Sequence, residues 1–318
     1  MPRVGKVNRL LILSTEATRY ADLIGAADLP QLKLVTATDA GSAQAVVGDC
    51  NIILGDPPLV SGVLAAAGQL EWVQSSWAGV DQLCRPGLRD DYLLTNAKGM
   101  FGALIGEYVM TYLFAFERQL FRMRNNQSRK LWQPLAYRPA KEVKLGIIGL
   151  GSIGRQLAVT ARFFGIHVTG LNRSGKPCEE VEKVHVADDL AGFLAPLDYV
   201  VLTLPATPQT RHFINADALK LMKPSAVLMN VGRGNSINET DLVHALREGV
   251  ISGAVLDVFE SEPLPEESPL WTLPNVFITP HTSAISFPDE IAGVFIENYR
   301  RFLRQEPLQY AVDFEFGY

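Results

Sequence analysis

The sequence contains little cysteine, and what it has is not arranged as a cross-link or a metal site. Its 318 residues include three cysteines, Cys50, Cys84 and Cys178, which are widely spaced and contain no C-x-x-C pair. An odd, scattered set disfavours both a disulfide framework and a zinc site. We therefore predict no metal, and we expect the cytoplasm as the compartment.

Long hydrophobic runs are also missing. The first fifteen residues have an apolar run too short for a signal peptide, and no segment reaches the ~20 apolar residues of a membrane span. The most apolar stretch, 103–123, is interrupted by Glu107, Glu117 and Arg118. We expect it to form a largely buried helix and expect no membrane partner.

Neither sign of charge dominates. The chain has 29 basic and 34 acidic residues, a net charge of -5, and no long basic run. This balance disfavours a nucleic-acid partner. The length and the 47% of hydrophobic residues instead favour a globular protein of about two domains.

Two series of short apolar runs alternate with stretches of helical length, which is typical of βα units and parallel sheets. The first series extends from Arg9 to Lys98 and the second begins at "KLGIIGLG". A helical pattern follows Ile285 without further strands, so we expect it to pack on the first unit. We predict a two-domain α/β fold in which a doubly wound Rossmann cofactor domain, 100–284, is inserted in a flavodoxin-like outer substrate domain, 1–99 with 285–318.

A glycine fingerprint lies where the second series begins. Gly149, Gly151 and Gly154 have G-x-G-x-x-G spacing, with Ser152 and Ile153 between them, after a strand and at the start of a helical pattern. The glycines allow a tight turn, close approach of a pyrophosphate and close helix–strand packing. The segment therefore predicts a dinucleotide site.

The next strand, "VTGLNRSG", ends without the usual acidic residue. A carboxylate there would bind the ribose hydroxyls and repel a 2′-phosphate, whereas Arg173 offers hydrogen-bond donors to that phosphate, helped by Asn172 and Ser174. We therefore predict a preference for NADP(H), with NAD(H) possible. The alternative is that Arg173 is a solvated residue at a strand end.

Three ionisable residues, Arg233, Glu262 and His281, follow later strands of the second series. Open parallel sheets bind their ligands at these carboxyl ends. We read the other four histidines as structural or exposed: His167, His185, His212 and His244.

The motifs "GLGSIG", "LTLPATPQTRHFI", "LMNVGRG", "GAVLDVFESEPL" and "NVFITPHTSA" together resemble the D-isomer-specific 2-hydroxyacid dehydrogenase family. Within it, the chain is most similar to the glyoxylate/hydroxypyruvate reductases, and the resemblance covers almost the whole length.

The resemblance implies that Arg233 binds the carboxylate of a 2-oxo acid, that His281 protonates the carbonyl oxygen, and that Glu262 orients the histidine. The residue types suit this chemistry, because hydride transfer to a ketone leaves negative charge on oxygen that a cationic imidazole can neutralise. The resemblance also implies that Asp257 contacts the nicotinamide carboxamide. The further cofactor-binding residues that it implies are Pro205, Thr210 and Val231.

In the first unit, "SSWAGVDQL" resembles the family's substrate loop, which implies that Ala78 and Gly79 bind the carboxylate through backbone amides. Trp77 departs from the commoner small residue and either narrows the pocket or serves as a buried anchor. The segment around Gly99 and Met100 resembles the crossover beside the cleft between the domains. We expect its apolar helix to be an interdomain and dimer surface in a homodimer.

The predicted reaction is reduction of glyoxylate or hydroxypyruvate to the D-2-hydroxy acid with NADPH. Two alternatives stay open. One is a dinucleotide-sensing protein similar to the C-terminal-binding-protein corepressors, which the absence of disordered tails disfavours. The other is a short phosphoglycerate dehydrogenase.

Overall fold

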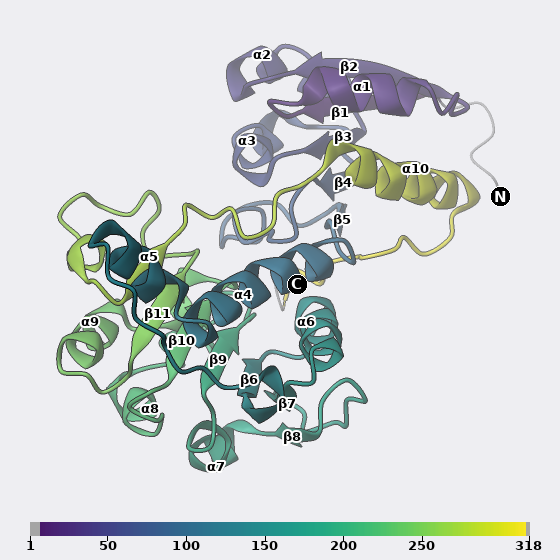
Figure 1. The fold of residues 1–318 in the computed structure, drawn as a ribbon. Coiled ribbons are helices and arrows are strands. Elements are labelled where there is room, and N and C mark those ends of the chain that lie inside the picture. Colours follow the sequence, from purple (N-terminus) through teal and green to yellow (C-terminus); the bar gives the residue numbers. More distant parts are fainter. Residues whose placement is uncertain (1–6, 316–318) are drawn as a thin grey trace. The chain divides into compact units, whose positions relative to one another are not determined.

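The computed structural model describes residues 7–315 and divides into two compact units (Figure 1). The discontinuous unit comprises Met1–Met100 and Ser286–Tyr318, and the inserted unit comprises Phe101–Ile285. Each unit has its own parallel sheet, which confirms the predicted α/β class. The last three residues of the predicted outer domain, 316–318, and its first six lie outside the described residues.

The discontinuous unit is built on a five-stranded parallel sheet in the order β2-β1-β3-β4-β5. This order is that of flavodoxin-like folds. Its strands are β1 (Asn8–Leu13), β2 (Leu32–Ala37), β3 (Ile52–Gly55), β4 (Trp72–Ser75) and β5 (Leu93–Thr95). Its α-helices are α1 (Ala17–Gly25), α2 (Ala40–Gln44), α3 (Pro57–Ser61) and α10 (Pro288–Arg304).

Helix α10 returns to this unit from the far end of the chain, as the sequence pattern predicts. Its Phe295 ring stacks on Trp72 of β4 with ring centroids 5.1 Å apart. Asn8 of β1 donates a hydrogen bond to the Tyr299 hydroxyl at 3.0 Å. All four side chains are buried, so α10 completes the core over one face of the sheet.

The inserted unit has a seven-stranded parallel sheet in the order β12-β11-β10-β9-β6-β7-β8. The order reverses between β6 and β9, which is the Rossmann switch point. Its strands are β6 (Lys144–Ile148), β7 (His167–Leu171), β8 (Lys183–His185), β9 (Tyr199–Leu202), β10 (Val227–Asn230), β11 (Gly253–Leu256) and β12 (Val276–Ile278). Its helices are α4 (Phe101–Glu117), α5 (Leu120–Ser128), α6 (Ser152–Phe163), α7 (Leu190–Leu194), α8 (Ala216–Lys220) and α9 (Glu239–Arg247).

The prediction of one helix over 103–123 is wrong, because the chain breaks between α4 and α5. Gln119 adopts a left-handed backbone with φ 52°. Glu117, the last residue of α4, accepts hydrogen bonds from Arg138 at 2.7 and 2.8 Å and from the Tyr199 hydroxyl at 2.7 Å. These bonds hold the end of α4 against the sheet, while α5 continues beyond residue 123 to Ser128.

Helix α4 has no single polar face because it is buried within its own unit. It packs on α6, where Gly106 lies so close that a Cβ there would approach the Thr160 hydroxyl to 2.9 Å. Its apolar residues Ile105, Val109 and Leu113 belong to the core beneath the sheet. Burial inside the inserted unit accounts for the buried side of α4, and the interdomain and dimer surface that we expect from this helix stays a prediction.

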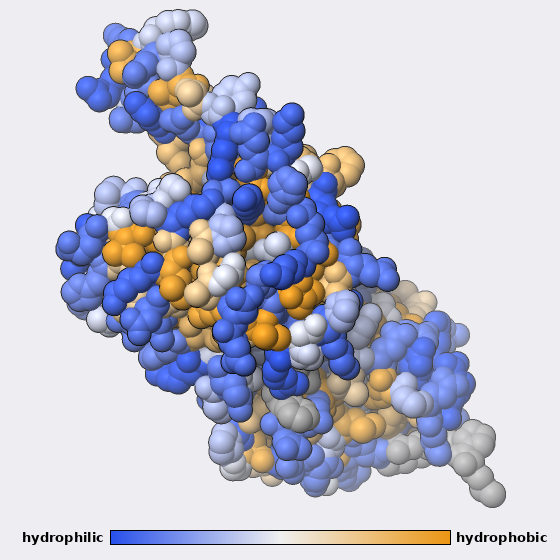
Figure 2. Space-filling view, turned by 90° about the horizontal axis from the view of Figure 1, so that it is seen from below, coloured by the Kyte–Doolittle hydropathy of each residue, from blue (hydrophilic) through white to orange (hydrophobic). Residues whose placement is uncertain are grey.

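The face seen in Figure 2 is largely hydrophilic, with apolar groups gathered toward its centre. Within residues 7–315, no helix combines the length and the apolar character that a membrane crossing requires. The segment after α4 exposes several large apolar side chains: Leu120, Phe121, Met123, Leu131, Trp132 and Tyr137.

We predict that Trp72→Ala destabilises the discontinuous unit by about 3–5 kcal/mol, because it removes a fully buried ring from the contact with α10. Urea unfolding followed by circular dichroism measures the change. The matched control is Trp132→Ala, since Trp132 is 98% exposed; we expect it to change stability by about 0.5 kcal/mol or less. Equal unfolding midpoints for the two variants would contradict the prediction.

Candidate active site in the inserted unit

The turn between β6 and α6 has the geometry that a pyrophosphate site needs. Gly149 has φ 105°, and a Cβ on Gly154 would overlap the Gly149 carbonyl group, whereas a Cβ on Gly151 would meet open space. Among the described residues, the N–H groups of Ser152, Ile153 and Gly154 have no hydrogen-bond acceptor. Free N–H groups at a helix N-terminus bind anions, so this turn fits a dinucleotide.

The next turn presents Arg173 to solvent at the end of β7. The side-chain oxygen Oδ1 of Asn172 accepts the N–H of Gly175 at 2.7 Å, and the Ser174 hydroxyl accepts the N–H of Lys176 at 3.3 Å. Asn172 and Ser174 therefore shape the turn. Whether they also bind a phosphate stays a prediction, as it does for Arg173.

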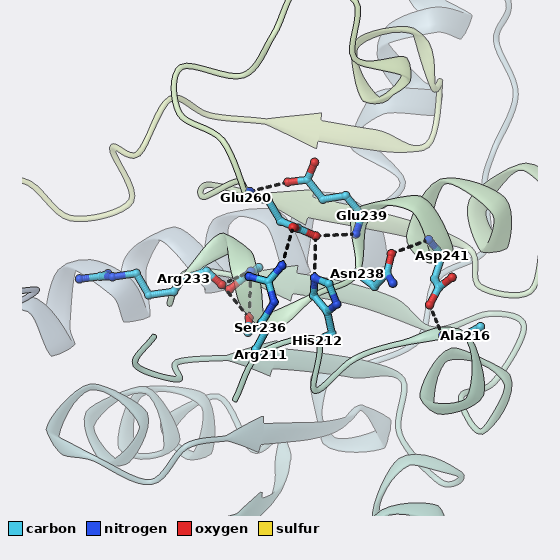
Figure 3. Close-up of polar contacts among 10 residues, drawn as sticks. Arg211, His212, Ala216, Arg233, Ser236, Asn238, Glu239, Asp241 and Glu260 are labelled. Atoms are coloured by element: carbon cyan, nitrogen blue, oxygen red, sulfur yellow. Dashed lines mark hydrogen bonds and ion pairs between the residues drawn. The ribbon is translucent and has the colours of Figure 1, made fainter. Parts of the chain in front are cut away.

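Arg233 directly follows β10 and begins a short 3₁₀ turn, Gly234–Ser236. Its carbonyl oxygen accepts hydrogen bonds from the Asn230 amide at 3.0 Å and from the Ser236 hydroxyl at 2.7 Å. Its guanidinium donates to the Gly232 carbonyl at 2.8 Å. Figure 3 shows the side chain extending away from the neighbouring His212 and Glu260.

Glu262 and His281 form a pair. The histidine Nδ1 lies 2.8 Å from the Glu262 Oε2 atom, and the other carboxylate oxygen accepts the Phe259 N–H at 3.0 Å. Burial acts to raise the pKa of Glu262, but the bond to His281, the bond to Phe259 and the positive charges of His281 and Arg233 together lower it. Because Nδ1 is engaged, Nε2 is left for another partner.

Glu260 ties the Glu262 loop to two others (Figure 3). Its N–H donates to the Glu239 carboxylate at 2.6 Å, and its own carboxylate accepts the Glu239 N–H at 3.3 Å and lies 3.1 Å from His212 Nε2. Burial raises the pKa of Glu239, and the charges of Glu260 and Glu262 raise it further against the bond from the Glu260 N–H. The sequence reading missed this cluster and assigned His212 no role in a site.

The remaining predicted cofactor residues follow the ends of β9, β10 and β11 in the sheet of the inserted unit. The Thr210 hydroxyl donates to the Pro205 carbonyl at 2.6 Å in the loop after β9, and Val231 is buried at the end of β10. Asp257 at the end of β11 is fully buried, and its carboxylate accepts the N–H groups of Thr282 and Ser283. Asp257 thus has a structural task that the resemblance did not indicate.

In the discontinuous unit, the predicted substrate loop is fixed at the end of β4. The Ser75 hydroxyl bonds both the N–H and the carbonyl of Trp77, at 3.0 and 2.9 Å, and the Asn96 amide donates to the Ala78 carbonyl at 2.9 Å. Within residues 7–315, the N–H groups of Ala78 and Gly79 have no acceptor. They suit a carboxylate ligand. The alternative that Trp77 is a buried anchor is wrong, since it is 41% exposed.

Two contacts of this loop were not predicted. The Ser76 hydroxyl donates to the Asp56 carboxylate at 2.5 Å, and the Ser286 hydroxyl donates to the Ser76 carbonyl at 2.7 Å. No local sequence signal joins residues so far apart. At the crossover, Gly99 has φ 94° and faces the Tyr310 hydroxyl.

Comparisons with known proteins identify the family of this chain. A model of the D-isomer specific 2-hydroxyacid dehydrogenase NAD binding domain matches residues 110–283. The chain belongs to this family. The family resemblance read from the motifs is thereby confirmed, and with it an oxidoreductase class.

Individual relatives extend the match over nearly the whole chain. The crystal structure of a D-isomer specific 2-hydroxyacid dehydrogenase family protein from Aeromonas salmonicida is 44% identical, with a TM-score of 0.93, and the match covers 97% of this chain and 100% of that one. An NADPH-dependent glyoxylate/hydroxypyruvate reductase from Sinorhizobium meliloti, solved with NADP and sulfate, is 30% identical with a TM-score of 0.86, over 98% and 100% of the two chains. Glyoxylate/hydroxypyruvate reductase A from Escherichia fergusonii is 31% identical over 80% of this chain and 84% of its own.

Among the described residues, no group of three or more His, Cys, Asp or Glu side chains is placed to hold a metal ion. The ionisable residues at this edge of the inserted unit's sheet instead form hydrogen-bonded pairs, His281 with Glu262 and Glu260 with Glu239.

We predict that Gly234→Ala disturbs both the Arg233 and the Glu262 loops, because a Cβ at Gly234 would overlap the backbone of Phe259. Overpacking of this kind costs about 1–3 kcal/mol, and we expect a lower Tm by calorimetry together with a loss of dehydrogenase turnover. The control is Gly68→Ala, where a Cβ would meet nothing within 4 Å. A Gly234→Ala enzyme with unchanged Tm and turnover would show that the loops do not depend on this contact.

Proposed function

We propose that this protein reduces a small 2-oxo acid, glyoxylate or hydroxypyruvate, to the D-2-hydroxy acid with NADPH. The observation that carries the proposal is the 2.8 Å contact between His281 Nδ1 and Glu262, on the same sheet edge as Arg233 and in the same unit as the β6–α6 glycine turn. The relatives named as glyoxylate/hydroxypyruvate reductases support the substrate class.

Bound NADPH supplies the hydride. His281 donates a proton from Nε2 to the carbonyl oxygen as negative charge develops there. Glu262 holds Nδ1, and this fixes both the ring orientation and the nitrogen that faces the substrate. Arg233 binds the substrate carboxylate through its planar guanidinium and so orients the carbonyl carbon.

For the predicted substrate loop of the discontinuous unit, we assign the N–H groups of Ala78 and Gly79, which have no acceptor within residues 7–315, to a substrate carboxylate by resemblance. The exposed indole of Trp77, in the same loop, supports a preference for two- and three-carbon acids, because it is available to limit the space around the substrate. The hydrogen bonds of Ser75 and Asn96 keep the loop rigid enough for this selection.

For the cofactor, the residues of the β6–α6 turn bind the pyrophosphate and Arg173 binds the 2′-phosphate of NADPH. The exposed position of Arg173 at the end of β7 supports the preference for NADP(H), as do the relatives solved with NADP or NADPH. NAD(H) stays a slower alternative cofactor. Asp257, Pro205, Thr210 and Val231 remain assigned near the nicotinamide by resemblance.

Two further expectations belong to this proposal. The large apolar side chains exposed in 120–137 support a homodimer, because exposed apolar area is typical of association surfaces. The cytoplasmic location rests on the low cysteine content.

The test of the function is kcat/KM for the purified protein with NADPH and NADH against glyoxylate, hydroxypyruvate, phenylpyruvate and 3-phosphohydroxypyruvate. We expect the fastest turnover with one of the two small acids and NADPH. A preference for the phosphorylated acid would identify a short phosphoglycerate dehydrogenase. Tight NADPH binding without turnover would favour the dinucleotide-sensing alternative.

We predict that Arg173→Ala lowers the ratio of kcat/KM with NADPH to that with NADH by about 10- to 100-fold, the effect of losing charge-assisted hydrogen bonds. Steady-state kinetics with both cofactors measure it. Arg247→Ala, an exposed arginine at the end of α9, serves as the control and should leave the ratio unchanged. An unchanged ratio in Arg173→Ala would remove the basis for the NADP(H) preference.

The lowered pKa of Glu262 predicts how stability depends on pH. A carboxyl whose pKa is lower in the folded state stabilises the fold fully above its unfolded pKa, about 4.3, and this contribution is lost as the pH falls through the folded value. We expect the stability advantage of the wild type over Glu262→Gln not to shrink between pH 7 and about 5 and to shrink only below that, as measured by urea unfolding. An advantage that already shrinks above pH 5.5 would indicate a raised pKa.

A further inference from the structure

Asp257 carries a buried negative charge that the proposed reaction does not use. The residue is 0% exposed. Its Oδ1 atom accepts the Thr279 hydroxyl at 2.5 Å and the Thr282 N–H at 2.8 Å, and its Oδ2 atom accepts the Ser283 N–H at 3.0 Å. A buried carboxylate is unfavourable unless it is fully hydrogen-bonded, and here both oxygens are engaged.

The groups that Asp257 binds lie on both sides of His281. Thr279 precedes the histidine, while Thr282 and Ser283 follow it, and the Asp257 carbonyl also accepts the His281 N–H at 2.8 Å. His281 has φ 54°, a left-handed conformation that costs a non-glycine residue about 1–3 kcal/mol and persists only where neighbours enforce it. The Asp257 bonds enforce it.

A second contact extends this network to helix α4. The Tyr108 hydroxyl lies 2.7 Å from the Thr279 hydroxyl. Because Thr279 gives its only proton to Asp257, Tyr108 must be the donor to Thr279. Burial is the main cause that raises the pKa of Tyr108, with the charge of Asp257 acting in the same direction. The phenol therefore stays protonated and can donate this hydrogen bond.

We propose that Asp257 is a positioning residue that holds the His281 backbone in its left-handed conformation, with Thr279 and Tyr108 as the supporting side chains. The inference rests on the proposed role of His281 as proton donor. It gives Asp257 a task besides the nicotinamide contact, and the two tasks affect different measurable constants. Loss of positioning lowers kcat, whereas loss of a nicotinamide contact weakens NADPH binding.

The main experiment compares wild type with Asp257→Asn. The amide has one acceptor oxygen and turns an NH₂ group toward N–H or hydroxyl donors, so at least one of the three bonds is lost. We expect kcat for the 2-oxo acid to fall about 10- to 100-fold, as for an ångström-scale misplacement of a reacting group, while the NADPH Kd from fluorescence titration stays within about threefold. A weaker Kd with unchanged kcat at saturating NADPH would overturn the proposal.

Thr279 provides a milder test if Asp257→Asn does not fold. Thr279→Val keeps the side-chain shape but removes the hydroxyl that links Asp257 to Tyr108, and Thr279→Ser restores it. We expect kcat to fall in the valine variant and to recover in the serine variant. Thr272→Val, at an exposed threonine, is the matched control and should keep wild-type kcat. Equal kcat in Thr279→Val and wild type would count against the network.

A readout without turnover separates this proposal from the proposed function. At a pH where the His281 imidazole is neutral, long-range ¹H–¹⁵N NMR reports its tautomer, and we expect a single Nδ1–H form in the wild type because Glu262 accepts from Nδ1. Asp257→Asn should give an averaged spectrum. If no 2-oxo acid is turned over, the proposed function fails, and the NMR comparison alone decides the positioning role; identical spectra would overturn it.

Discussion

The hydrogen bonds of the buried Asp257 carboxylate are the interaction on which the geometry around His281 depends, at the sheet edge that also carries Arg233 and Glu262. Parallel strands deliver their loops to one edge, but a loop that turns through a left-handed residue needs external bonds to stay there. Asp257 supplies them to both sides of His281. Burial of the carboxylate is in turn possible only because the His281 loop donates these hydrogen bonds to it, so the carboxylate and the loop stabilise each other.

The sheet register explains why three residues distant in sequence can form one site. Asn230, Leu256 and Ile278 are neighbours across β10, β11 and β12, and Arg233, Glu262 and His281 follow these strand ends by a few residues. Gly234 lets the first two loops touch, because any side chain there would meet Phe259. The backbone contact between Gly234 and Phe259 thus sets the distance between the Arg233 and Glu262 loops.

Much of the fold and of the candidate site could be predicted from the sequence, because continuous apolar runs and glycine spacing reflect local rules that hold in any parallel sheet. The sequence reading therefore located β6, α6 and the strand ends that carry Arg233 and His281. It missed the short edge strand β8 and the left-handed break at Gln119, and it left open whether Trp77 is exposed, since each depends on contacts made across the fold. The contacts of Glu260 were missed for the same reason, because its partners Glu239 and His212 lie in other segments of the chain.

The electrostatics of this edge follow from how its carboxylates are paired. Three of them, Glu239, Glu260 and Glu262, lie close together, and like charges cannot all remain ionised without compensation. Glu262 has His281 and Arg233 beside it, which lower its pKa, whereas burial and its acidic neighbours raise the pKa of Glu239. Pairing thus separates the two groups: the pKa of Glu262 is lowered beside the imidazole that it holds, whereas the pKa of Glu239, farther from that pair, is raised.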